Sequence, residues 1–434
     1  MFNDTINLLH LERLRNKIEL LDTITRDNTL FVNLKLKKED LKCPVCESGS
    51  SFHDYRLKNI TYSISTNYLC YIKYHARRYK CRSCMKIFKE SNPLLEKYEK
   101  ISLITKLNVL EHLKTPSNTF TSASNIYHIS KQSVINIFDT YVDAQRKTLP
   151  EVLSIDEFYK ARSSKYKYAC MLYDFKSKKV IDVLTTRHKN YLVEYFSKIS
   201  LEEKKRVKYV IIDMWESYRD TVKLCLPKAL IAIDSFHLIK DLNDKVSRIR
   251  IQVMNKHRLD DTSLITNDSN YYMLKKFSYF FMKDFDSITD KLITIPKIKT
   301  AWDKHTILNH LLSIDDTLKS IYLLKERYRT FNRTARFETC DDELDDLIDE
   351  FRNHELEEMR SFGRTLINWR DEIKHSFIRI DGKRLSNGPI EGANSQVKTI
   401  IKTSAGIHDF YRLRNRIMYA LNKDIPIKNK EKDK

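Results

Sequence analysis

Apolar positions between residues 151 and 240 fall into five short runs separated by polar segments. The runs occupy residues 152–159, 166–175, 179–186, 209–212 and 230–233. The first three follow one another across short polar links, which is typical of neighbouring antiparallel strands. The last two are nearly continuous in apolar residues, as buried strands are, and an amphipathic helical segment precedes each of them. A long helical segment then begins near His237. This order predicts an α/β fold, in which three antiparallel strands lead into two further helix–strand units of one mixed sheet.

The N-terminal 40 residues predict a short helix followed by one strand. The apolar residues at helical spacing are Leu11, Leu14, Ile18 and Leu21. Residues 30–36 then alternate between apolar and polar side chains, as one strand of a half-buried sheet does. The interior of the next segment, from Tyr68 to Tyr79, alternates in the same way and indicates one arm of a β-hairpin.

Residues 95–147 predict three helices. Residues 122–138 have the pattern of a helix, a short turn and a second helix, for which Ser130 is a suitable N-cap. The helix-turn-helix form of this pattern binds DNA through its second helix, although three-helix units also serve as plain scaffolding. In the DNA-binding form, the contacts would come from the residues Lys131, Gln132, Ser133 and Asn136.

Residues 256–375 are again mostly helical, and they contain an acidic stretch at 341–350. The acids alternate with Leu344, Leu347, Ile348 and Phe351 at helical spacing. We therefore expect them to form the solvated face of a helix and not a metal site.

Charge indicates what the protein binds. The 78 Lys and Arg residues outnumber the 58 Asp and Glu residues, which gives a formal net charge of +20. Such an excess predicts a polyanionic partner, most often nucleic acid, while a merely basic protein would show it too. The 434 residues leave room for about three domains. No apolar run is long enough to cross a bilayer, and residues 1–17 lack the features of a signal peptide. We expect a cytoplasmic, nucleoid-associated protein with no membrane partner.

Eight cysteines in a reducing compartment argue for metal ligands and buried thiols rather than disulfides. Cys43 and Cys46 form one Cys-x-x-Cys pair, and Cys81 and Cys84 form another. Two such pairs complete a closed tetrahedral Zn²⁺ site, and an inserted β-hairpin would bring them together. The alternative is two unrelated pairs of reduced thiols. Weaker candidates for zinc ligands are His53, Cys70 and His75. The remaining cysteines, Cys170, Cys225 and Cys340, are expected to be packing residues.

Three aspartates stand where a carboxylate is hard to explain by packing. Asp156 interrupts the first apolar strand, Asp213 directly follows the run 209–212, and Asp234 follows the run 230–233. A carboxylate in such a position is costly unless it is paired, hydrogen-bonded or bound to a metal. Adjacent strands would place the three groups side by side at one sheet edge, where they need a cation such as Mg²⁺. For each acid alone, a helix cap or an ion pair is an equal alternative.

A fourth acid, Glu391, lies in a segment that is rich in glycine for this chain. Four of the six glycines, at positions 382, 388, 392 and 406, gather there, and glycine permits sharp turns and close approach of the backbone. Asn387 is a candidate helix cap, with Pro389 in the first turn. Glu391, Asn394 and Lys398 would then share one helix face. Carboxylates that hold two metal ions about 3.5–4 Å apart can catalyse phosphodiester displacement.

In these segments the chain resembles the ISL-three-type family of bacterial insertion-sequence transposases, which are DDE enzymes with a ribonuclease H-like catalytic core. The resemblance runs nearly end to end and is carried by residues 154–158, 213–218, 233–237 and 386–394. It implies a zinc ribbon, a helix-turn-helix domain and a catalytic domain with a helical insertion. At Glu47 and Met85 the chain departs from the family, whose zinc knuckles usually carry glycine there.

The resemblance also implies roles for the acids. Asp156 and Asp213 would be the first two metal-binding aspartates, and Glu391 would complete the triad around Mg²⁺ or Mn²⁺. The supporting residues would be Asp234 and His237 of an Asp-x-x-His element, together with Asn394 and Lys398. The partner would be double-stranded DNA, as terminal inverted repeats and as target, bound by a homo-oligomer that pairs two ends.

The expected organisation combines the residue patterns with this resemblance. Its segments are an N-terminal helix and strand (1–40), a zinc ribbon (41–94), a helix-turn-helix domain (95–148), a first part of the catalytic core (149–255), a helical insertion (256–375), a second part of the core with the glutamate (376–422) and a basic tail (423–434). The rival readings are an inactive transposase-derived DNA-binding regulator, a ribonuclease H-like nuclease and a purely structural zinc protein. The structural zinc protein accounts for neither the buried acids nor the glycine cluster.

Overall fold

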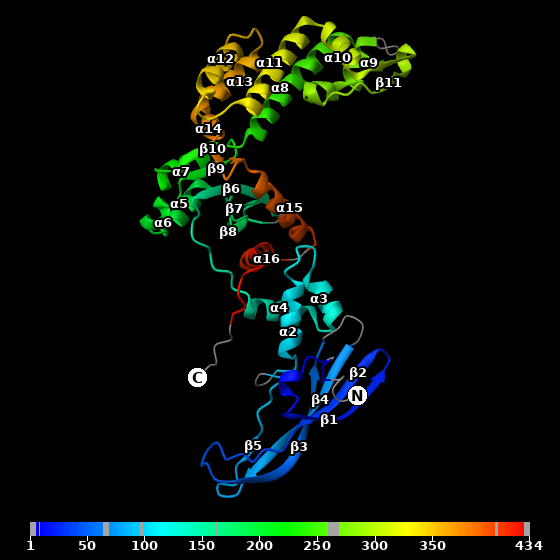
Figure 1. Cartoon of the computed structure of the whole chain (residues 1–434), viewed down its shortest axis with the longest axis vertical. Helices are drawn as coiled ribbons and strands as arrows, with labels where there is room; N and C mark the ends of the chain where they lie inside the picture. Colours follow the sequence, from blue (N-terminus) through cyan, green and yellow to red (C-terminus); the bar gives the residue numbers. More distant parts are fainter. Residues whose placement is uncertain are drawn as a thin grey trace. The chain divides into compact units, whose positions relative to one another are not determined.

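The structure is a computed structural model that describes residues 6–7, 9–63, 69–95, 99–160, 164–258, 269–403 and 407–428 (Figure 1). Two compact units make up the chain. The first consists of residues 1–146 and 395–434, and the second consists of residues 147–394. Helix α15, Gly388–Thr403, contains the boundary between them. None of the helices in the described ranges is long and apolar enough to span a membrane.

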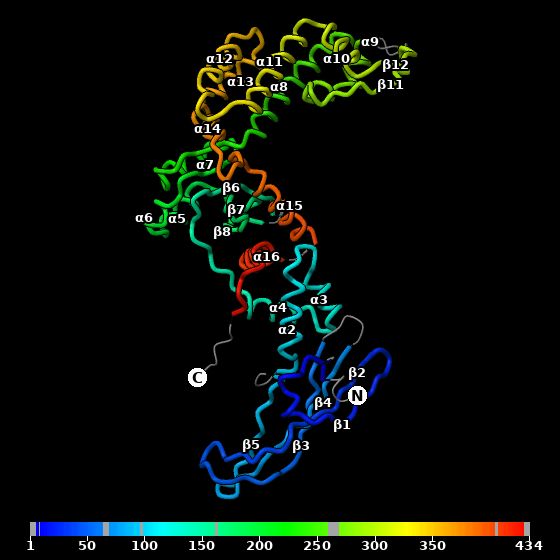
Figure 2. Tube along the Cα trace, in the orientation of Figure 1, coloured from blue at the N-terminus to red at the C-terminus, as the bar shows by residue number. Residues whose placement is uncertain are grey.

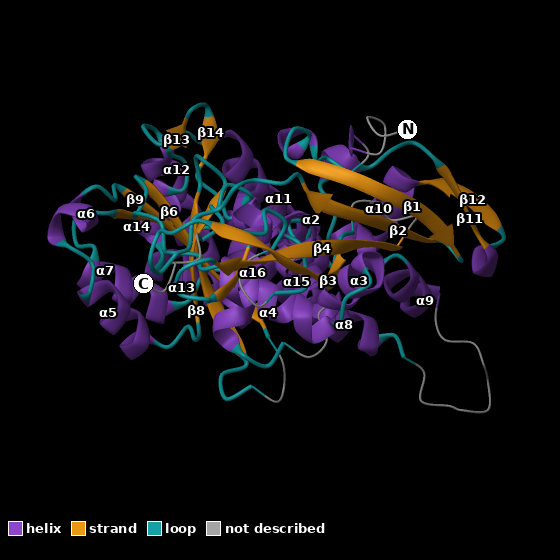
Figure 3. Ribbon diagram, turned by 90° about the horizontal axis from the view of Figure 1, so that it is seen from below, coloured by secondary structure: helices purple, strands orange, loops and turns teal. Residues whose placement is uncertain are grey.

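The first unit begins with a mixed β-sheet, whose strands are orange in Figure 3. The strands are β1 (Ile18–Arg26), β2 (Thr29–Leu36), β3 (Ser50–Thr61), β4 (Leu69–Cys81) and β5 (Ile87–Lys89). Their order is β1-β2-β4-β3, and β5 also pairs with β4. Strands β3 and β4 are antiparallel, with Ser50 opposite Cys81 and Thr61 opposite Tyr71. The predicted hairpin arm in the cysteine segment is confirmed; Tyr68, its expected first residue, lies outside the described residues.

The expected N-terminal helix is wrong beyond Leu14. A 3-10 turn, η1 (Glu12–Leu14), ends there, and Ile18 and Leu21 lie in strand β1. Strand β1 pairs antiparallel with β2 across the turn Asp27–Asn28, in which both residues have positive φ angles of 45° and 56°. Two consecutive residues of this conformation suit the twist of a β-hairpin. Pairing with the alternating strand β2 therefore outweighs the helical spacing of four apolar residues.

Three helices follow the sheet: α2 (Leu103–His112), α3 (Phe120–Tyr127) and α4 (Lys131–Tyr141). Each begins at a hydroxyl cap, because the side chains of Ser102, Thr119 and Ser130 accept hydrogen bonds from backbone N–H groups of the first turn. The predicted cap at Ser130 is confirmed. Helix α3 ends at His128, which has the left-handed conformation (φ 52°), and a tight turn leads from it into α4.

The C-terminal helix α16 (Phe410–Asn422) packs on these three helices, as the red trace beside the cyan one shows (Figure 2). The rings of Phe138 in α4 and Tyr419 in α16 lie 5.9 Å apart, and Arg412 forms a bidentate ion pair with Asp139. The buried Arg416 donates to two backbone carbonyls beyond α2. We expected residues 376–422 to form one part of the catalytic core. Within this range, residues up to 394 group with the second unit and the residues from 395 onward group with the first.

The second unit is built on a five-stranded mixed sheet. Its strands are β6 (Val152–Tyr159), β7 (Tyr168–Asp174), β8 (Lys179–Leu184), β9 (Tyr209–Ile212) and β10 (Leu230–Ile233), in the order β10-β9-β6-β7-β8. Strand β7 is antiparallel to both β6 and β8, whereas β9 is parallel to β6 and to β10. The α/β fold class and the five predicted strands are confirmed.

Helices α5 (Lys189–Ser197), α6 (Leu201–Lys205) and α7 (Glu216–Cys225) connect the last three strands. Strand side chains alternate between the two faces of the sheet. Leu153 and Ile155 join Phe196 of α5 and Val222 of α7 in one large core. The opposite face forms a smaller cluster that includes Leu385, from the segment before α15. The sheet is therefore covered on one face by its own connecting helices and on the other by the segment that carries Glu391.

A helical region separates this sheet from α15 in the sequence, and α8 (Ser235–Lys256) leads into it. Its helices are α9 (Ser269–Lys276), α10 (Lys304–Ser313), α11 (Asp316–Thr334), α12 (Cys340–Arg352), α13 (Glu357–Asn368) and α14 (Arg370–His375), with the 3-10 turns η2 (Ser278–Phe281), η3 (Phe285–Ser287) and η4 (Pro296–Ile298). The mostly helical character predicted for residues 256–375 is confirmed. The pattern did not predict the hairpin of β11 (Leu292–Ile295) and β12 (Thr300–Asp303).

The acidic stretch at 341–350 forms the solvated face of α12, as we expected. Leu344, Leu347 and Phe351 are buried on the other face. Two of the acids, Asp341 and Asp345, form ion pairs with Arg370 of α14. These ion pairs therefore connect α12 to a neighbouring helix.

Candidate functional site

Three aspartates lie level with one another on adjacent parallel strands. In the pairing of β6 with β9, Ser154 lies opposite Ile211. Two residues further along each strand, Asp156 is level with Asp213, and the β9–β10 register continues the row to Asp234. Because side chains alternate, all three belong to the sheet face that packs against the segment leading into α15. The sequence-based expectation of three acids at matching heights agrees with this register.

Asp156 is 8% exposed and accepts two hydrogen bonds. The backbone N–H of Glu157 donates to one carboxylate oxygen (2.7 Å), and the side-chain amide of Asn394 in α15 donates to the other (2.6 Å). Burial, together with the nearby charge of Asp213, raises the pKa of Asp156 to about 7. At neutral pH this group therefore needs either a proton or a cation.

Asp213 is bound from two sides. The side-chain amide of Asn387 donates to its Oδ1 (2.6 Å), and Nε2 of His237 lies 3.3 Å from its Oδ2. Burial raises the pKa of Asp213 to about 6, against the lowering effect of His237 and of the Asn387 hydrogen bond. Asp156 and Asp213 are neighbours, and both have raised pKa values. Ionisation of both is therefore unfavourable unless a divalent cation balances their charge.

Asp234 and His237 lie beside Asp213 at the start of α8. Nδ1 of His237 is 3.5 Å from Asp234 Oδ2, so the imidazole bridges two carboxylates. The backbone N–H of Asn387 also donates to Asp234 (3.4 Å). The hydrogen bond to Asp234 raises the pKa of His237. The ligand atoms of Asp213, Asp234 and His237 lie within 4.8 Å of one another and could hold a metal ion.

Helix α15 presents one face to these acids. Asn387, just before its first residue, and Asn394 contact Asp213 and Asp156. Glu391 lies between the two asparagines, at positions i+4 and i−3 on a helix, so it shares their face. Glu391 itself is exposed. Glu391 is therefore an exposed residue on the helix face whose two asparagines bind the carboxylate row.

The side chain of Asn387 does not cap α15 in the expected way. Its amide nitrogen donates to Asp213, and its oxygen makes no hydrogen bond among the described residues. Its backbone carbonyl accepts the N–H of Glu391 (2.9 Å). Asn387 is fully buried, because it serves the carboxylate row instead of the helix end. Lys398 lies one turn beyond Asn394 and is exposed.

The proposed triad of Asp156, Asp213 and Glu391 is drawn together only in part. The two aspartates interact electrostatically, and Glu391 lies one helical turn from the asparagine that binds Asp156. Among the residues that the structure describes, the three do not bring their ligand atoms within 4.8 Å of one another.

Sequence reasoning missed a cluster beside this row. Glu157 forms an ion pair with Arg187 and accepts a hydrogen bond from the buried hydroxyl of Tyr218 (3.0 Å). The Arg187 guanidinium lies 4.4 Å from the ring of Trp215 and 4.6 Å from that of Tyr168. The aromatic residues that follow Asp213 in the sequence were a signal for it, since such rings often hold an arginine.

The four predicted zinc ligands lie together at one end of the β3–β4 pair. The Sγ atoms of Cys43 and Cys84 are 3.6 Å apart, and those of Cys46 and Cys81 are 3.4 Å apart. Sulfurs of a tetrahedral zinc site lie about 3.8 Å apart, since each Zn–S bond is about 2.3 Å long. All four ligand atoms fall within 4.8 Å of one another. The cluster could therefore hold one Zn²⁺ ion.

Backbone groups prepare these thiols for a metal. The N–H of Val45 lowers the pKa of Cys43, and that of Ser48 lowers the pKa of Cys46 to about 6. The N–H of Lys86 also lowers the pKa of Cys84, but hydrogen bonds with neighbouring thiols outweigh it and raise that pKa to about 12. The spacing of the four sulfur atoms and the lowered pKa values of Cys43 and Cys46 agree with a structural metal site.

Glu47 and Met85 occupy the positions at which the family's knuckles carry glycine. Both have positive φ angles, 56° and 59°. Each turn therefore keeps the backbone conformation that favours glycine, although the side chain differs. The substitutions leave the ligand geometry of the cluster in place.

The other cysteine and histidine candidates stand apart from it. His53 and His75 are not in the four-cysteine cluster. Cys70 is buried, and burial raises its pKa to about 12. Cys170 and Cys340 are buried and Cys225 is partly buried, which agrees with their expected packing role.

The candidate DNA-contacting residues lie on the first turns of α4. Lys131, Gln132 and Asn136 are exposed and Ser133 is partly exposed. Gln132 donates to the side-chain oxygen of Asn136 (2.7 Å), so the two side chains form one polar unit on the surface.

Comparison with known proteins identifies the family. Residues 153–417 match a family model described as a transposase, of the ISL3-type DDE group. A comparison with curated proteins found no match. The matched region contains the sheet, the helical region, the carboxylate row and α15, which is more than half of the chain. The chain therefore belongs to this transposase family.

Proposed function

We propose that the protein is a DDE transposase, which cuts DNA at the ends of an insertion sequence and joins the freed ends to target DNA. One observation carries this proposal: Asp156 and Asp213 are level on adjacent strands, and each accepts a hydrogen bond from an asparagine, Asn394 within the helix that carries Glu391 and Asn387 just before it. Membership of the transposase family supports it.

Asp156, Asp213 and Glu391 would hold Mg²⁺ or Mn²⁺. Their oxygen atoms are the hard ligands that these ions prefer, and the raised pKa values of the two buried aspartates indicate a site that a cation would complete. When bound, such ions activate an attacking oxygen and stabilise the leaving one in phosphodiester displacement.

The chain's own residues would position the reactants. Asn387 and Asn394 orient the two aspartates, because each donates to one carboxylate oxygen. His237, with Asp234 behind it, would fix the second oxygen of Asp213. Lys398 is exposed on α15 and would neutralise a DNA phosphate. Positioning and charge neutralisation are sufficient, because phosphoryl transfer of this kind needs no covalent enzyme intermediate.

We assign the sheet to the ribonuclease H-like class. Strands β6, β7 and β8 are antiparallel neighbours, and β9 and β10 extend the sheet from the other side of β6 as parallel strands. The first two acids then stand on the central strand and on its parallel neighbour, while the third is supplied from α15, after the helical insertion. This arrangement agrees with the family resemblance.

We assign α3 and α4 to a helix-turn-helix that binds the terminal inverted repeats. Lys131, Gln132, Ser133 and Asn136 would make the base contacts from the exposed start of α4. The zinc ribbon would add contacts to the same ends, and a homo-oligomer would pair two of them. The net charge of +20 favours such a polyanionic partner.

A strand-transfer assay tests the proposal. The purified protein is incubated with Mg²⁺ or Mn²⁺, a labelled duplex from the DNA that flanks the gene and an unlabelled target duplex. We expect cleavage at one end of the repeat and joined products. Binding without cleavage would favour an inactive regulator, and cleavage without joining would favour a ribonuclease H-like nuclease. Either outcome would overturn the transposase assignment.

A further inference from the structure

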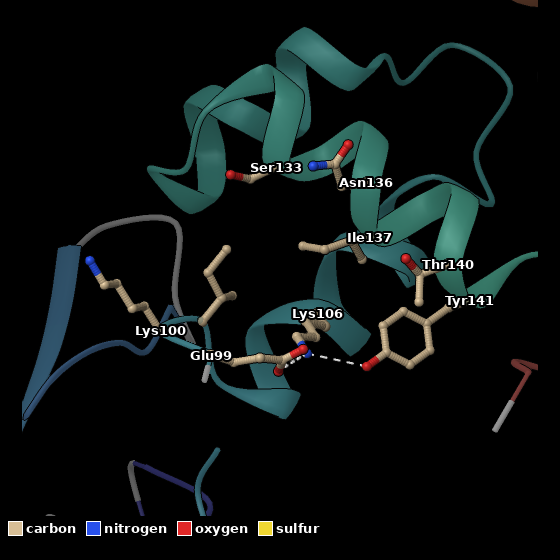
Figure 4. A pocket seen from close by; sticks show the side chains of 9 residues that line it. Glu99, Lys100, Lys106, Ser133, Asn136, Ile137, Thr140 and Tyr141 are labelled. Atoms are coloured by element: carbon tan, nitrogen blue, oxygen red, sulfur yellow. Dashed lines mark hydrogen bonds and ion pairs between the residues drawn. The ribbon is translucent and has the colours of Figure 1, made fainter. Parts of the chain in front are cut away.

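Two cavities of the first unit share a wall. One has a volume of 720 Å³ and is lined by strands β3 and β5 and the residues that follow β5. The other has a volume of 250 Å³ and is lined by α4 and by residues before and within α2 (Figure 4). Glu99 and Lys100 line both. The two cavities therefore form one groove, the β3–α4 groove, which leads from an edge of the sheet to the exposed side of α4.

Backbone pairing fixes the shared wall to both sides of the groove. The N–H of Thr61, the last residue of β3, donates to the carbonyl of Lys100 (2.9 Å), and the N–H of Ser102 donates back to Thr61 (3.0 Å). Two residues beyond β3, the N–H of Ser63 donates to the hydroxyl of Thr105 in α2 (2.9 Å). Lys100 is thus held between the zinc-bearing sheet and the three helices.

The carboxylates of the groove are already neutralised. Glu90 accepts a hydrogen bond from the Tyr74 hydroxyl (2.7 Å) and lies 3.6 Å from the guanidinium of Arg77. Glu99 is bound by the ammonium group of Lys106, which is also 3.2 Å from the Tyr141 hydroxyl, as the dashed lines in Figure 4 show. Neither acid leaves an uncompensated negative charge in the groove.

Three lysines of the groove have no such compensation. Lys58, Lys89 and Lys100 line it, and within the described part of the chain none of them has a carboxylate partner. Lys89 and Lys100 are exposed and Lys58 is partly exposed. The groove therefore carries a net positive charge along the part that is lined by β3, by β5 and by the residues after β5.

The far wall of the groove is polar. Ser133, Asn136 and Thr140 of α4 line it and point into it in Figure 4. They stand at i, i+3 and i+7, so they share one helix face. Hydroxyl and amide groups can donate to phosphate oxygens and to base edges alike. Cations along one end and neutral hydrogen-bonding groups at the other match the backbone and the adjacent base edges of a duplex.

We propose that the β3–α4 groove binds one phosphate backbone of duplex DNA, with Lys58, Lys89 and Lys100 as its phosphate ligands. The inference rests on the DNA binding proposed above and adds to it that the zinc-bearing sheet and α4 hold the same duplex. Because α4 lines the groove with Ser133 and Asn136, the bound backbone places base edges next to the predicted contact residues.

The test compares two triple variants of the full-length protein. Lys58→Gln, Lys89→Gln and Lys100→Gln are combined in one, and Lys17→Gln, Lys37→Gln and Lys38→Gln in the other. The control lysines are exposed, belong to the same unit and line neither cavity. Both variants lose the same formal charge. Affinity for a duplex from the DNA that flanks the gene, and for a shuffled duplex, is measured at several salt concentrations. Zinc content and circular dichroism report folding.

Each phosphate contact contributes about 0.9 to the slope of log affinity against log salt. We expect the groove variant to lose about 2–3 from this slope on both duplexes, and the control variant to keep the wild-type slope. Equal slopes in the two variants, or an unchanged slope in the groove variant while the wild type binds, would overturn the groove assignment. Absence of DNA binding by the wild type would instead overturn the proposed function. If the triple variant is misfolded, Lys100→Gln alone is expected to lower the slope by about 0.9.

Discussion

The two candidate metal centres of this protein are built in opposite ways. The four cysteines come from two tight turns that a single antiparallel strand pair brings together, and their sulfur atoms already lie near the spacing of a tetrahedral site. The carboxylate row draws on three strands and on a helix that follows a long insertion. The sulfur site is local, whereas the carboxylate site depends on contacts between distant segments and has an exposed glutamate beside its buried aspartates.

The difference between the two centres matches two roles, stabilisation of a small module and binding of a substrate. A closed site with four protein ligands stabilises a small module and leaves no position for a substrate. The carboxylate site has an exposed glutamate and two buried aspartates with raised pKa values. Such a site leaves positions for a reacting phosphate. The following predictions test whether the contrast holds.

Loss of zinc should have the largest effect. Cys81→Ser removes one of four ligands and should abolish stoichiometric zinc binding and unfold the ribbon, because structural zinc contributes about 10–16 kcal/mol to such modules. Metal content and thermal unfolding measure both effects. Cys225→Ser, outside the cluster, is the matched control. One zinc per chain retained by Cys81→Ser would refute the assignment of that ligand.

Removal of a carboxylate charge should have the second largest effect. Asp156→Asn and Asp213→Asn should each lower the rate of strand cleavage on the order of 10³-fold, by analogy with the loss of a group that stabilises the transition state, while the fold is retained. Asp220→Asn, in an exposed ion pair with Lys189, should cleave like the wild type. Glu391→Gln is the decisive third case, because Glu391 is not yet within ligand distance. Wild-type activity in that variant would exclude Glu391 from the mechanism.

The pH dependence of stability should separate the two centres. The pKa of Asp156 is about 7 in the folded protein and about 3.9 in an unfolded chain, so folding takes up a proton between these values. Stability without added Mg²⁺ or Mn²⁺ is therefore full below about pH 4 and is lost as pH rises through 7, by up to about 4 kcal/mol.

Chemical unfolding between pH 4 and 8 measures this loss. Asp156→Asn should flatten the pH dependence and be more stable than the wild type at pH 8. A wild-type protein whose stability rises over this range, or a variant that keeps the same slope, would contradict the burial of an unneutralised carboxyl.

Asparagines that orient the acids should matter less. Asn394→Ala removes the donor to Asp156 Oδ2 and should weaken Mn²⁺ binding and cleavage by about 10–100-fold, as loss of an outer-shell partner does. Gln396→Ala, two residues on and exposed, is the control. An unchanged Mn²⁺ affinity in Asn394→Ala would show that the hydrogen bond does not orient Asp156 for metal.

The smallest effect should come from the arginine beside the row. Arg187→Met loses both the contacts with the rings of Trp215 and Tyr168 and the ion pair with Glu157, and should lower stability by about 1–2 kcal/mol. Arg187→Lys should recover part of it, since lysine keeps the charge but not the planar stack. Arg206→Met, which is exposed, should change stability little. Equal stability of all three variants would mean that the stacking contributes nothing.

The sequence by itself determined the strands of the five-stranded sheet that carries the carboxylate row, the four candidate zinc ligands and the positions of the three aspartates. Each of these features has a local signature: apolar runs of strand length, Cys-x-x-Cys spacing, and acids directly at the end of buried strands. Features with a local signature can be predicted because they depend on few residues that are distant in the sequence. This holds for the burial of a strand and for the binding of a metal by two cysteines of one turn.

Only the tertiary structure decided the remaining features. Residues 18–26 form a strand because β2 offers a partner for pairing. The side chain of Asn387, expected as a helix cap, donates a hydrogen bond to Asp213 instead. Helix α16 belongs to the N-terminal unit because Arg412 and Tyr419 meet α4. These outcomes depend on pairs of residues that are far apart in the chain. Their contact energies exceed local preferences only after the fold has brought them together.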